Sequence, residues 1–338
     1  QYYGYENRQD KLPLTKDTHI RVSSISKMVT AIGAMQLVEA GLIDLDESLS
    51  TYFGFDFYNP FYPDIPVTLR QLLTHTSSIS ASTGAGKSQS DTSLEKIITH
   101  NIRNKKNFLH KKPGTTYKYS NYAYGVLGAL IEKVSNQNFN TYMQENVFQP
   151  LEIDAAYHPL FLTDQDHVST TYQQGQVYVT GKKYLDGYNS FENTVDPEHH
   201  YLIAFGKLWI RPADLAKLLV VLCGDGTYNG VALLSEETVL QMREDQQHKG
   251  SVQGESIYGL GVERVPSLLE DRLVYGHQGM STGMIANAYF DPATSLCFVS
   301  VTNGSSQARN NTISLLARDL FPLAYDVLGL SLQTIARE

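Results

Sequence analysis

Apolar residues recur with a helical period in four long stretches of the chain. The first covers residues 24–40, where apolar side chains return every three or four positions, and Gly41 follows as a left-handed stop. Three more such stretches begin at Asn121, Pro212 and Ser235. We therefore expect four amphipathic helices, each burying one face.

After Tyr258 the pattern changes to an alternation with period two, which is typical of strands. We predict four strands, over residues 258–265, 272–276, 284–290 and 296–302. A short helix begun by Thr68 and a closing helix over residues 312–330 complete the elements. The order favours an α+β fold, in which an antiparallel sheet is flanked by helices and a mainly helical subdomain is inserted.

The 338 residues suffice for a single large domain. We expect its α/β part to comprise about 1–45 and 250–338, with the helical subdomain at about 46–249. Two segments lack periodicity. Residues 74–93 are rich in Ser, Thr and Gly and predict a long loop, and residues 157–201 are polar and Tyr-rich, which suits substrate-side loops or a lid.

Composition narrows the classes of partner. Hydrophobic residues make up 42% and charged residues 18% of the chain, as in ordinary globular proteins, and the net charge of -8 disfavours a nucleic-acid surface. No apolar run reaches about 18 residues, so we expect no membrane span in this chain. Cys223 and Cys297 each lie in an apolar run, which favours two buried free thiols over a disulfide. No spacing of Cys and His ligands indicates a metal.

Ser24 and Lys27 stand three residues apart at the start of the first helix, so that their side chains share one helical face. A serine hydroxyl becomes a strong nucleophile when a neighbour takes its proton, and a lysine with a lowered pKa is such a base. The first turn of a helix also offers N–H groups to an oxyanion. Taken alone, the S-x-x-K spacing more often marks a surface serine and a solvated lysine than a catalytic pair.

Two further short motifs carry polar side chains. Tyr119 and Asn121 precede the helix that starts near residue 121, where a phenol and an amide serve either a site or a simple turn with Ser120 as the N-cap. His277 and Gly279 end a predicted strand, where glycines allow another backbone or a ligand to approach closely. A histidine there either contacts substrate or is a satisfied edge residue.

Together, and in this order, S-x-x-K at Ser24, Y-x-N at Tyr119 and H-x-G at His277 resemble the three motifs of the serine β-lactamase and penicillin-binding-protein superfamily. The chain looks most similar to the branch of class C β-lactamases and their D-alanyl carboxypeptidase, D-aminopeptidase and esterase relatives. Stretches such as 37–41 and 68–77 resemble it too, and the likeness runs over about 17–325. It implies a β-lactamase/transpeptidase-like fold.

The resemblance implies roles for these residues. Ser24 would attack an acyl carbon, Lys27 would hold or take its proton, and Tyr119 would shuttle a proton to the leaving group; which of the last two is the base stays open. Asn121 would orient Lys27 and the substrate amide, and His277 would lie near the charged end of the substrate. The N–H groups of Ser24 and Met280, the latter beside Gly279, would form the oxyanion hole. No metal or cofactor is implied.

Some departures limit the likeness. Ser78 stands where the family usually has Gly, and His277 replaces a lysine, which makes strong β-lactamase activity less expected because a neutral imidazole anchors a carboxylate weakly. Only 23 residues precede Ser24, so that the family's opening helix and first strand look absent or cut short. Either the chain is trimmed, or its sheet has an exposed edge that a neighbour covers.

The leading hypothesis is a bacterial serine hydrolase, secreted or surface-anchored, that forms an acyl-enzyme through Ser24. Its substrate would be a D-alanyl peptide or ester of peptidoglycan or teichoic acid, or another small amide or ester. The alternatives are a catalytically weak protein that binds cell-wall peptides in the same cleft, and a genuine class C-like β-lactamase. The sequence leaves the acyl donor, the acceptor and the oligomeric state open.

Overall fold

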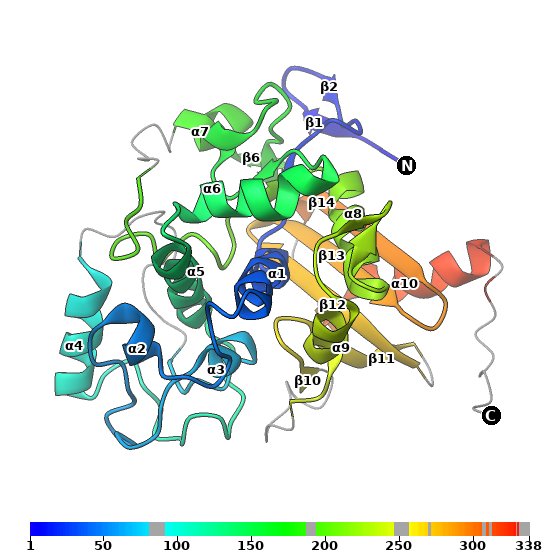
Figure 1. Ribbon diagram of the computed structural model, residues 1–338. Helices are drawn as coiled ribbons and strands as arrows, with labels where there is room; N and C mark the ends of the chain where they lie inside the picture. The colour runs from blue at the N-terminus through cyan, green and yellow to red at the C-terminus, as the bar shows by residue number, and fades with distance from the viewer. Residues whose placement is uncertain are drawn as a thin grey trace, which may run out of the picture.

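The computed structural model describes residues 1–80, 92–186, 194–246, 257–269, 272–305, 309–310, 313–328 and 330 (Figure 1). Its α-helices are α1 (Ile25–Glu39), α2 (Leu49–Phe53), α3 (Leu69–Leu73), α4 (Leu94–Asn104), α5 (Asn121–Ser135), α6 (Phe139–Met143), α7 (Gly181–Asp186), α8 (Pro212–Cys223), α9 (Glu236–Arg243) and α10 (Leu315–Val327). A π-helical turn (Gln144–Phe148) and two 3₁₀ turns (Gln149–Leu151 and Pro159–Phe161) supplement them.

The main antiparallel sheet has the strand order β10 (Ile257–Tyr258), β11 (Glu263–Leu269), β12 (Arg272–Ser281), β13 (Gly283–Asp291) and β14 (Leu296–Ser305). The smaller pairings join β1 (Tyr5–Asn7) to β2 (Leu12–Pro13), β5 (Thr171–Gln173) to β6 (Gln176–Val179), β8 (Thr227–Tyr228) to β9 (Val231–Ala232), and β15 (Arg309–Asn310) to β16 (Ile313–Ser314). A three-stranded sheet has the order β3 (Ile20–Arg21), β7 (Trp209–Ile210) and β4 (Ala155–Ala156).

The two faces of the five-stranded sheet carry different helices. Along β13, alternate side chains point to opposite faces. Ala288 and Phe290 join the core made by α1, α5 and α8, whereas Tyr289 packs with Phe321 of α10 in a second core. Figure 1 shows α1, in blue near the centre, between the sheet and α5, with α10 behind the sheet. The fold is therefore α+β, with helices on both faces of an antiparallel sheet, as expected from the sequence.

Helix α1 is buried over most of its length. From Ile25 to Met35 each of its residues is buried, because it contacts the sheet on one side and α5 and α6 on the other. The segment that leads into β7 also runs against α5, where Gly125 leaves no room for a side chain: a Cβ there would lie 1.9 Å from the carbonyl oxygen of Tyr201. Glycine at this position thus allows the loop to approach the helix.

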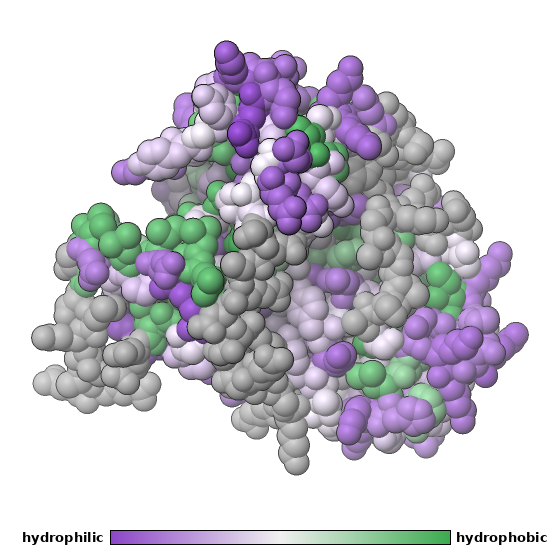
Figure 2. All heavy atoms as spheres, turned by 180° about the vertical axis from the view of Figure 1, so that it is seen from behind, coloured by the Kyte–Doolittle hydropathy of each residue, from purple (hydrophilic) through white to green (hydrophobic). Residues whose placement is uncertain are grey.

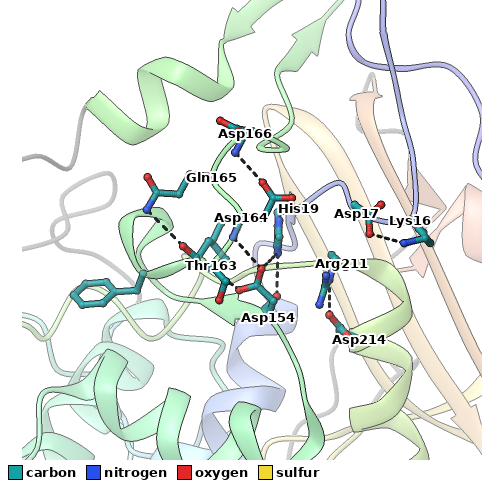
Figure 3. Close-up of polar contacts among 12 residues, drawn as sticks. Lys16, Asp17, His19, Asp154, Thr163, Asp164, Gln165, Asp166, Arg211 and Asp214 are labelled. Atoms are coloured by element: carbon teal, nitrogen blue, oxygen red, sulfur yellow. Dashed lines mark hydrogen bonds and ion pairs between the residues drawn. The ribbon is translucent and has the colours of Figure 1, made fainter.

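A polar cluster fastens the segment before α1 to the middle of the chain. The buried His19 ring places Nε2 3.1 Å from a carboxylate oxygen of Asp154. The same carboxylate accepts hydrogen bonds from the N–H groups of Thr163 and Asp164, at 2.9 and 3.3 Å. Figure 3 shows the Asp154 carboxylate surrounded by these three donors. This cluster fixes the chain just ahead of β3, and therefore ahead of Ser24.

The predicted elements correspond to observed ones in most places. Helices α1, α3, α5, α8, α9 and α10 confirm the predicted helices, with Thr68, Ser120 and Ser235 as N-caps. The prediction of one strand over residues 258–265 is wrong, because Gly261, with a φ of +82°, breaks it into β10 and β11. Strand β12 continues to Ser281 and so includes the H-x-G motif.

Other expectations have mixed outcomes. Helix α4 has no counterpart among the predicted elements, and residues 81–91 and 187–193 of the two predicted loop segments lie outside the described residues. Cys223 and Cys297 are free thiols, as predicted, but only Cys223 is buried, whereas Cys297 is partly exposed. The division of the chain at about residues 45 and 249 stays a prediction; α8, which falls in the expected helical part, packs on β13 and β14.

The surface of α10 is partly apolar. Leu323, Val327 and Leu328 are half or more exposed, and Figure 2 shows hydrophobic residues gathered at this end of the molecule, seen from behind. Among the described residues, no helix combines the length and the apolar character that a membrane crossing requires.

The pairing of His167 with Glu6 predicts a pH-dependent contribution to stability. Nδ1 of His167 lies 3.1 Å from the buried carboxylate of Glu6, and this hydrogen bond raises the pKa of His167 above its usual 6.5. A group whose pKa is raised in the folded state stabilises the fold at pH values below its unfolded pKa. This stabilisation is lost as the pH rises through the folded pKa. Because the ring is 42% exposed, we expect at most about 1 kcal/mol.

The measurement is the free energy of unfolding in urea of the native chain and of His167→Gln, at a pH about one unit below 6.5 and at another about two units above it. The variant should lose more stability at the lower pH. Glu6→Gln should remove the difference between the two pH values, and an equal loss at both would contradict the assignment.

Candidate active site

Ser24 lies at the N-terminus of α1, at the end of a tight turn. Ser23 adopts a left-handed conformation with a φ of +49°. The N–H groups of Ile25, Ser26 and Lys27 each donate to the residue three positions back. No hydrogen bond of the Ser24 N–H is found among the described residues, as expected for the first amide of a helix. The half-buried hydroxyl and this amide are thus both available to a ligand.

Lys27 is buried completely, directly beneath Ser24. Its Nζ lies 3.3 Å from Ser24 Oγ and donates to the carbonyl oxygen of Phe205 at 2.7 Å. Three aromatic rings surround the amine: the centroids of Tyr119, Phe205 and Tyr124 lie 4.9, 5.6 and 5.9 Å from Nζ. The pairing of β3 with β7 brings Phe205 here, because Val22 N–H donates to Leu208 at 3.0 Å.

This environment changes the acidity of the amine. Burial lowers the pKa of Lys27 well below its usual 10.5, because water no longer solvates the ammonium, and an ionised Glu263 would oppose this shift only in part. A neutral amine has a lone pair and accepts a proton from a hydroxyl at hydrogen-bond distance. The positions of Ser24 and Lys27 therefore suit the predicted roles of nucleophile and base.

Tyr119 is positioned by His75. The buried ring of His75 lies against Tyr119, with 4.3 Å between the ring centroids, and its Nδ1 accepts the N–H of Ser120 at 3.1 Å. Ser120 in turn caps α5, since its side chain accepts from Ala123 N–H. The phenol ring is thereby held over the Lys27 amine, which brings the first two motifs together.

Asn121 is the first residue of α5. Its Oδ1 is buried and has no hydrogen-bond partner in the part of the chain that the structure describes. No hydrogen bond between Asn121 and Lys27 is found in that part either; the carbonyl of Phe205 holds the amine instead. The orienting role of Asn121 toward Lys27 stays a prediction, and its free acceptor suits the N–H of a bound amide.

Strand β12 passes very close to the turn at Ser24. A Cβ on Gly279 would lie 2.0 Å from the carbonyl oxygen of Val22 and 3.2 Å from Ser24 N, so only glycine fits. The carbonyl of Met280 accepts the Ser23 hydroxyl at 3.0 Å. In a strand the N–H and C=O of one residue point to the same side, so the N–H of Met280 also faces this turn. The two predicted oxyanion donors, the N–H groups of Ser24 and Met280, thus both lie where β12 meets this turn.

His277 is buried on the same face of β12 as Gly279. Its Nδ1 lies 2.6 Å from the carbonyl oxygen of Gln278, and its Nε2 lies 2.6 Å from the hydroxyl of Tyr258. Burial, aided by the charge of Lys27, lowers the pKa of His277 from 6.5 to about 3. The imidazole is therefore neutral near pH 7, and both of its nitrogens have protein partners.

Several contributors were not identified from the sequence. Phe205 acts through its backbone carbonyl, which has no sequence signal, and Glu263 and Tyr258 reach the site only because β10 and β11 fold beside β12. His75 lies within the stretch 68–77 that resembles the family, so that stretch was a usable signal. Among the described residues, no group of His, Cys, Asp or Glu is arranged to hold a metal.

Four features define a class of serine-nucleophile proteins with a β-lactamase-like fold. They are a serine at a helix N-terminus, a buried lysine one turn on, a tyrosine above the amine, and a strand edge that faces the serine. The family comparison agrees: residues 1–319 match the Beta-lactamase family. The chain belongs to this family.

Individual relatives are distant. The chain is 26% identical over 225 residues to the protein flp of Staphylococcus aureus, covering 64% of this chain and 44% of flp. The structure of SurE with D-Leu is 26% identical with a TM-score of 0.69, covering 89% of this chain and 63% of SurE. D-amino acid amidase from Ochrobactrum anthropi SV3, complexed with D-phenylalanine, is 20% identical, with a TM-score of 0.69 and coverage of 96% and 89%. The chain thus spans about half to two thirds of flp and SurE.

The contact between Gly279 and Val22 yields a prediction. In Gly279→Ala the new methyl group would lie 2.0 Å from the Val22 carbonyl, so β12 must move away from Ser24. A displacement of about 1 Å in such a site costs on the order of 100-fold in rate, and the rate at which a fluorophosphonate probe acylates Ser24 should fall by that amount. Gly206→Ala is the matched control, because its Cβ would only touch Ser23 at 3.9 Å. Equal rates in both variants would contradict the geometry.

The lowered pKa of Lys27 yields a second prediction. The acylation rate of Ser24 should fall as pH decreases through the pKa of Lys27, because protonation removes the lone pair. Lys27→Arg keeps a fixed cation and should slow acylation by about 10²–10⁴-fold. The measurement is the rate with a fluorophosphonate between about pH 4 and 9. Lys217→Arg in α8 is the control, because the Lys217 amine donates to the carbonyls of Leu151 and Glu152. Rapid acylation of Lys27→Arg would exclude Lys27 as the base.

Proposed function

We propose that this protein is a serine hydrolase that forms an acyl-enzyme on Ser24. The observation that carries the proposal is the contact of 3.3 Å between Ser24 Oγ and the amine of a completely buried lysine. Burying an ammonium costs several kcal/mol unless it is paired, so Lys27 favours the neutral amine, which is the form that can accept the proton of Ser24. The surrounding aromatic rings and the carbonyl of Phe205 stabilise the amine in one position.

The proposed reaction proceeds in two stages. Ser24 Oγ attacks the acyl carbon as its proton passes to Lys27 Nζ, and the N–H groups of Ser24 and Met280 stabilise the oxyanion. The bond to the leaving group then breaks, and the proton returns to that group by way of Tyr119, which lies over the amine. Water, deprotonated by the same groups, attacks the ester on Ser24 and releases the acid.

The proposed substrate is a D-aminoacyl ester or amide, of which the D-alanyl groups of peptidoglycan and teichoic acid are the leading cases. The D-Leu bound to SurE, at 26% identity, and the D-phenylalanine bound to the amidase support this class. Within it, the neutral His277 favours donors with an uncharged distal end, such as esters and amides, over peptides that end in a free carboxylate. We also propose an extracellular or cell-surface location, where such substrates occur.

Two other functions remain as alternative proposals. A protein that only holds a cell-wall peptide would not require a buried lysine beside Ser24, so the geometry favours the hydrolase. A genuine β-lactamase is less favoured, because a neutral imidazole replaces the cation that would bind the β-lactam carboxylate.

The first test is the intact mass of the protein after incubation with a fluorophosphonate and, separately, with penicillin. One adduct on the native chain, absent in Ser24→Ala, is the expected result with the fluorophosphonate. Ser93→Ala, which lacks the N-cap hydroxyl of α4, should still react. Absence of any adduct with either reagent would refute the hydrolase and favour the binding protein.

The second test compares substrates by kcat/KM. The chain should hydrolyse D-alanyl esters and amides at least about tenfold faster than their L-isomers. It should prefer them by a similar factor over a peptide that ends in a D-Ala-D-Ala carboxylate, because the missing ion pair between a cation of the site and this carboxylate is worth about 1.4 kcal/mol or more. A preference for the free carboxylate, or rapid hydrolysis of a chromogenic cephalosporin, would support a carboxypeptidase or a β-lactamase instead.

A further inference from the structure

Among the described residues, no strand pairs with the end of β12 that carries Gly279 and Met280 on the side opposite β13. The pairing of β11 with β12 begins at Leu269, opposite Arg272, and ends at Glu263, the first residue of β11, opposite Gly276. From His277 onward the described strands pair with β12 only through β13. The proposed oxyanion donor Met280 therefore depends on other contacts for its position.

The paired part of β12 on this side thus runs from Arg272 to Gly276, opposite Leu269 to Glu263. Beyond Gly276, the side chain of His277 connects β12 to β10. Its Nδ1 lies 2.6 Å from the carbonyl oxygen of Gln278 in β12, and its Nε2 lies 2.6 Å from the hydroxyl of Tyr258 in β10. The hydroxyl of Tyr258 also lies 3.1 Å from Oε1 of Glu263. These contacts link β10, β11 and β12 where the regular pairing ends.

The number of protons in this linkage is fixed by chemistry. A carbonyl only accepts, so Nδ1 of His277 carries a proton toward Gln278. The imidazole is neutral, because burial lowers its pKa well below 6.5, so Nε2 accepts the single proton of Tyr258. The oxygen of Tyr258 then faces Oε1 of Glu263 at 3.1 Å with no proton of its own left to give. A hydrogen bond forms between these two oxygens only if Glu263 is protonated.

We propose that Glu263 and Tyr258 are positioning residues of the Ser24 site: a protonated Glu263 donates to Tyr258, Tyr258 donates to His277, and His277 donates to Gln278. This chain of three hydrogen bonds holds the end of β12 against the turn at Ser24. The inference rests on the proposed function for its catalytic consequence, whereas the hydrogen-bond chain itself does not depend on it.

The surroundings suit a proton held on Glu263. Glu263, Tyr258 and His277 are all buried, and a buried carboxyl favours the neutral form. The ionisable groups that face the unit are Lys27 of α1, Tyr124 of α5, and His75, Tyr117 and Tyr119 of the loops beside them. Arg264, the neighbour of Glu263 in β11, pairs with Asp245 at 3.0 Å.

The protonated carboxyl also has a consequence for the base. A Glu263 carboxylate would attract the ammonium of Lys27 and raise its pKa. With the proton on Glu263 this attraction is absent, so the neutral amine of Lys27 is favoured further. The same unit therefore positions the oxyanion donor and supports the base.

Three variants test the positioning role through the rate of acylation. In Tyr258→Phe the ring stays and the hydrogen-bond chain is cut, so kcat should fall by about tenfold to 100-fold with KM changed less than about twofold. Glu263→Gln keeps an N–H donor toward Tyr258 and should stay within about threefold of the native rate. Glu263→Ala should fall as far as Tyr258→Phe. Equal losses in Glu263→Gln and Glu263→Ala, or a native rate in Tyr258→Phe, would overturn the proposal.

Tyr325→Phe is the matched control for loss of a buried tyrosine hydroxyl. Tyr325 of α10 is completely buried and donates to the Asp291 carboxylate at 2.6 Å, on the other face of the sheet. Its removal should lower the melting temperature about as much as Tyr258→Phe does, while kcat stays native. A fall of kcat in both variants would show that Tyr258 acts only through stability, and would overturn the positioning role.

A spectroscopic measurement separates this inference from the proposed function. In the ¹⁵N-labelled native chain, the imidazole nitrogens of His277 should report a neutral ring with the proton on Nδ1 from about pH 5 to 8, and the signal should change in Tyr258→Phe. This result would support the chain of hydrogen bonds even if no substrate were hydrolysed. A proton on Nε2, or titration near the usual value of 6.5, would refute it.

Discussion

The burial of the Lys27 amine beside Ser24 is the constraint on which the rest of the site depends. An amine that has lost its water must be neutral or compensated, and here a single carbonyl oxygen, three aromatic rings and one serine hydroxyl surround it. Such an enclosure cannot come from one helix. It requires that α1 be covered by the sheet, by α5 and by the segment ahead of β7, which explains why α1 is buried at every residue from Ile25 to Met35.

The same enclosure brings together parts of the chain that are far apart in sequence. The carbonyl of Phe205 comes from the segment before β7, which is held by pairing with β3. Tyr119 comes from the loop ahead of α5 and rests on the ring of His75. On the opposite side, β12 passes so close to Ser24 that Gly279 has no room for a side chain. Each contact places a group within reach of one serine hydroxyl.

The neutral imidazole of His277 distinguishes this site from one that binds a carboxylate through a cation. Both ring nitrogens are engaged by the protein, one by the backbone of β12 and one by Tyr258. Its surroundings thus assign the histidine to the architecture of the strand rather than to charge recognition. This view is consistent with a protein that acts on esters and amides, and it links the chemistry of the third motif to the place where β11 stops pairing.

The sequence by itself determined the fold class, most helices, their N-caps and the family, because helical periodicity and capping are local and the three motifs are short. Ser24 and Lys27 could be paired from their spacing alone, since one helical turn brings such side chains to one face. Only the tertiary structure decided that the amine is buried, that Phe205 holds it, that Gly261 divides a predicted strand, and that Glu263 and Tyr258 meet His277. These features arise from contacts between residues distant in sequence, for which local patterns carry no information.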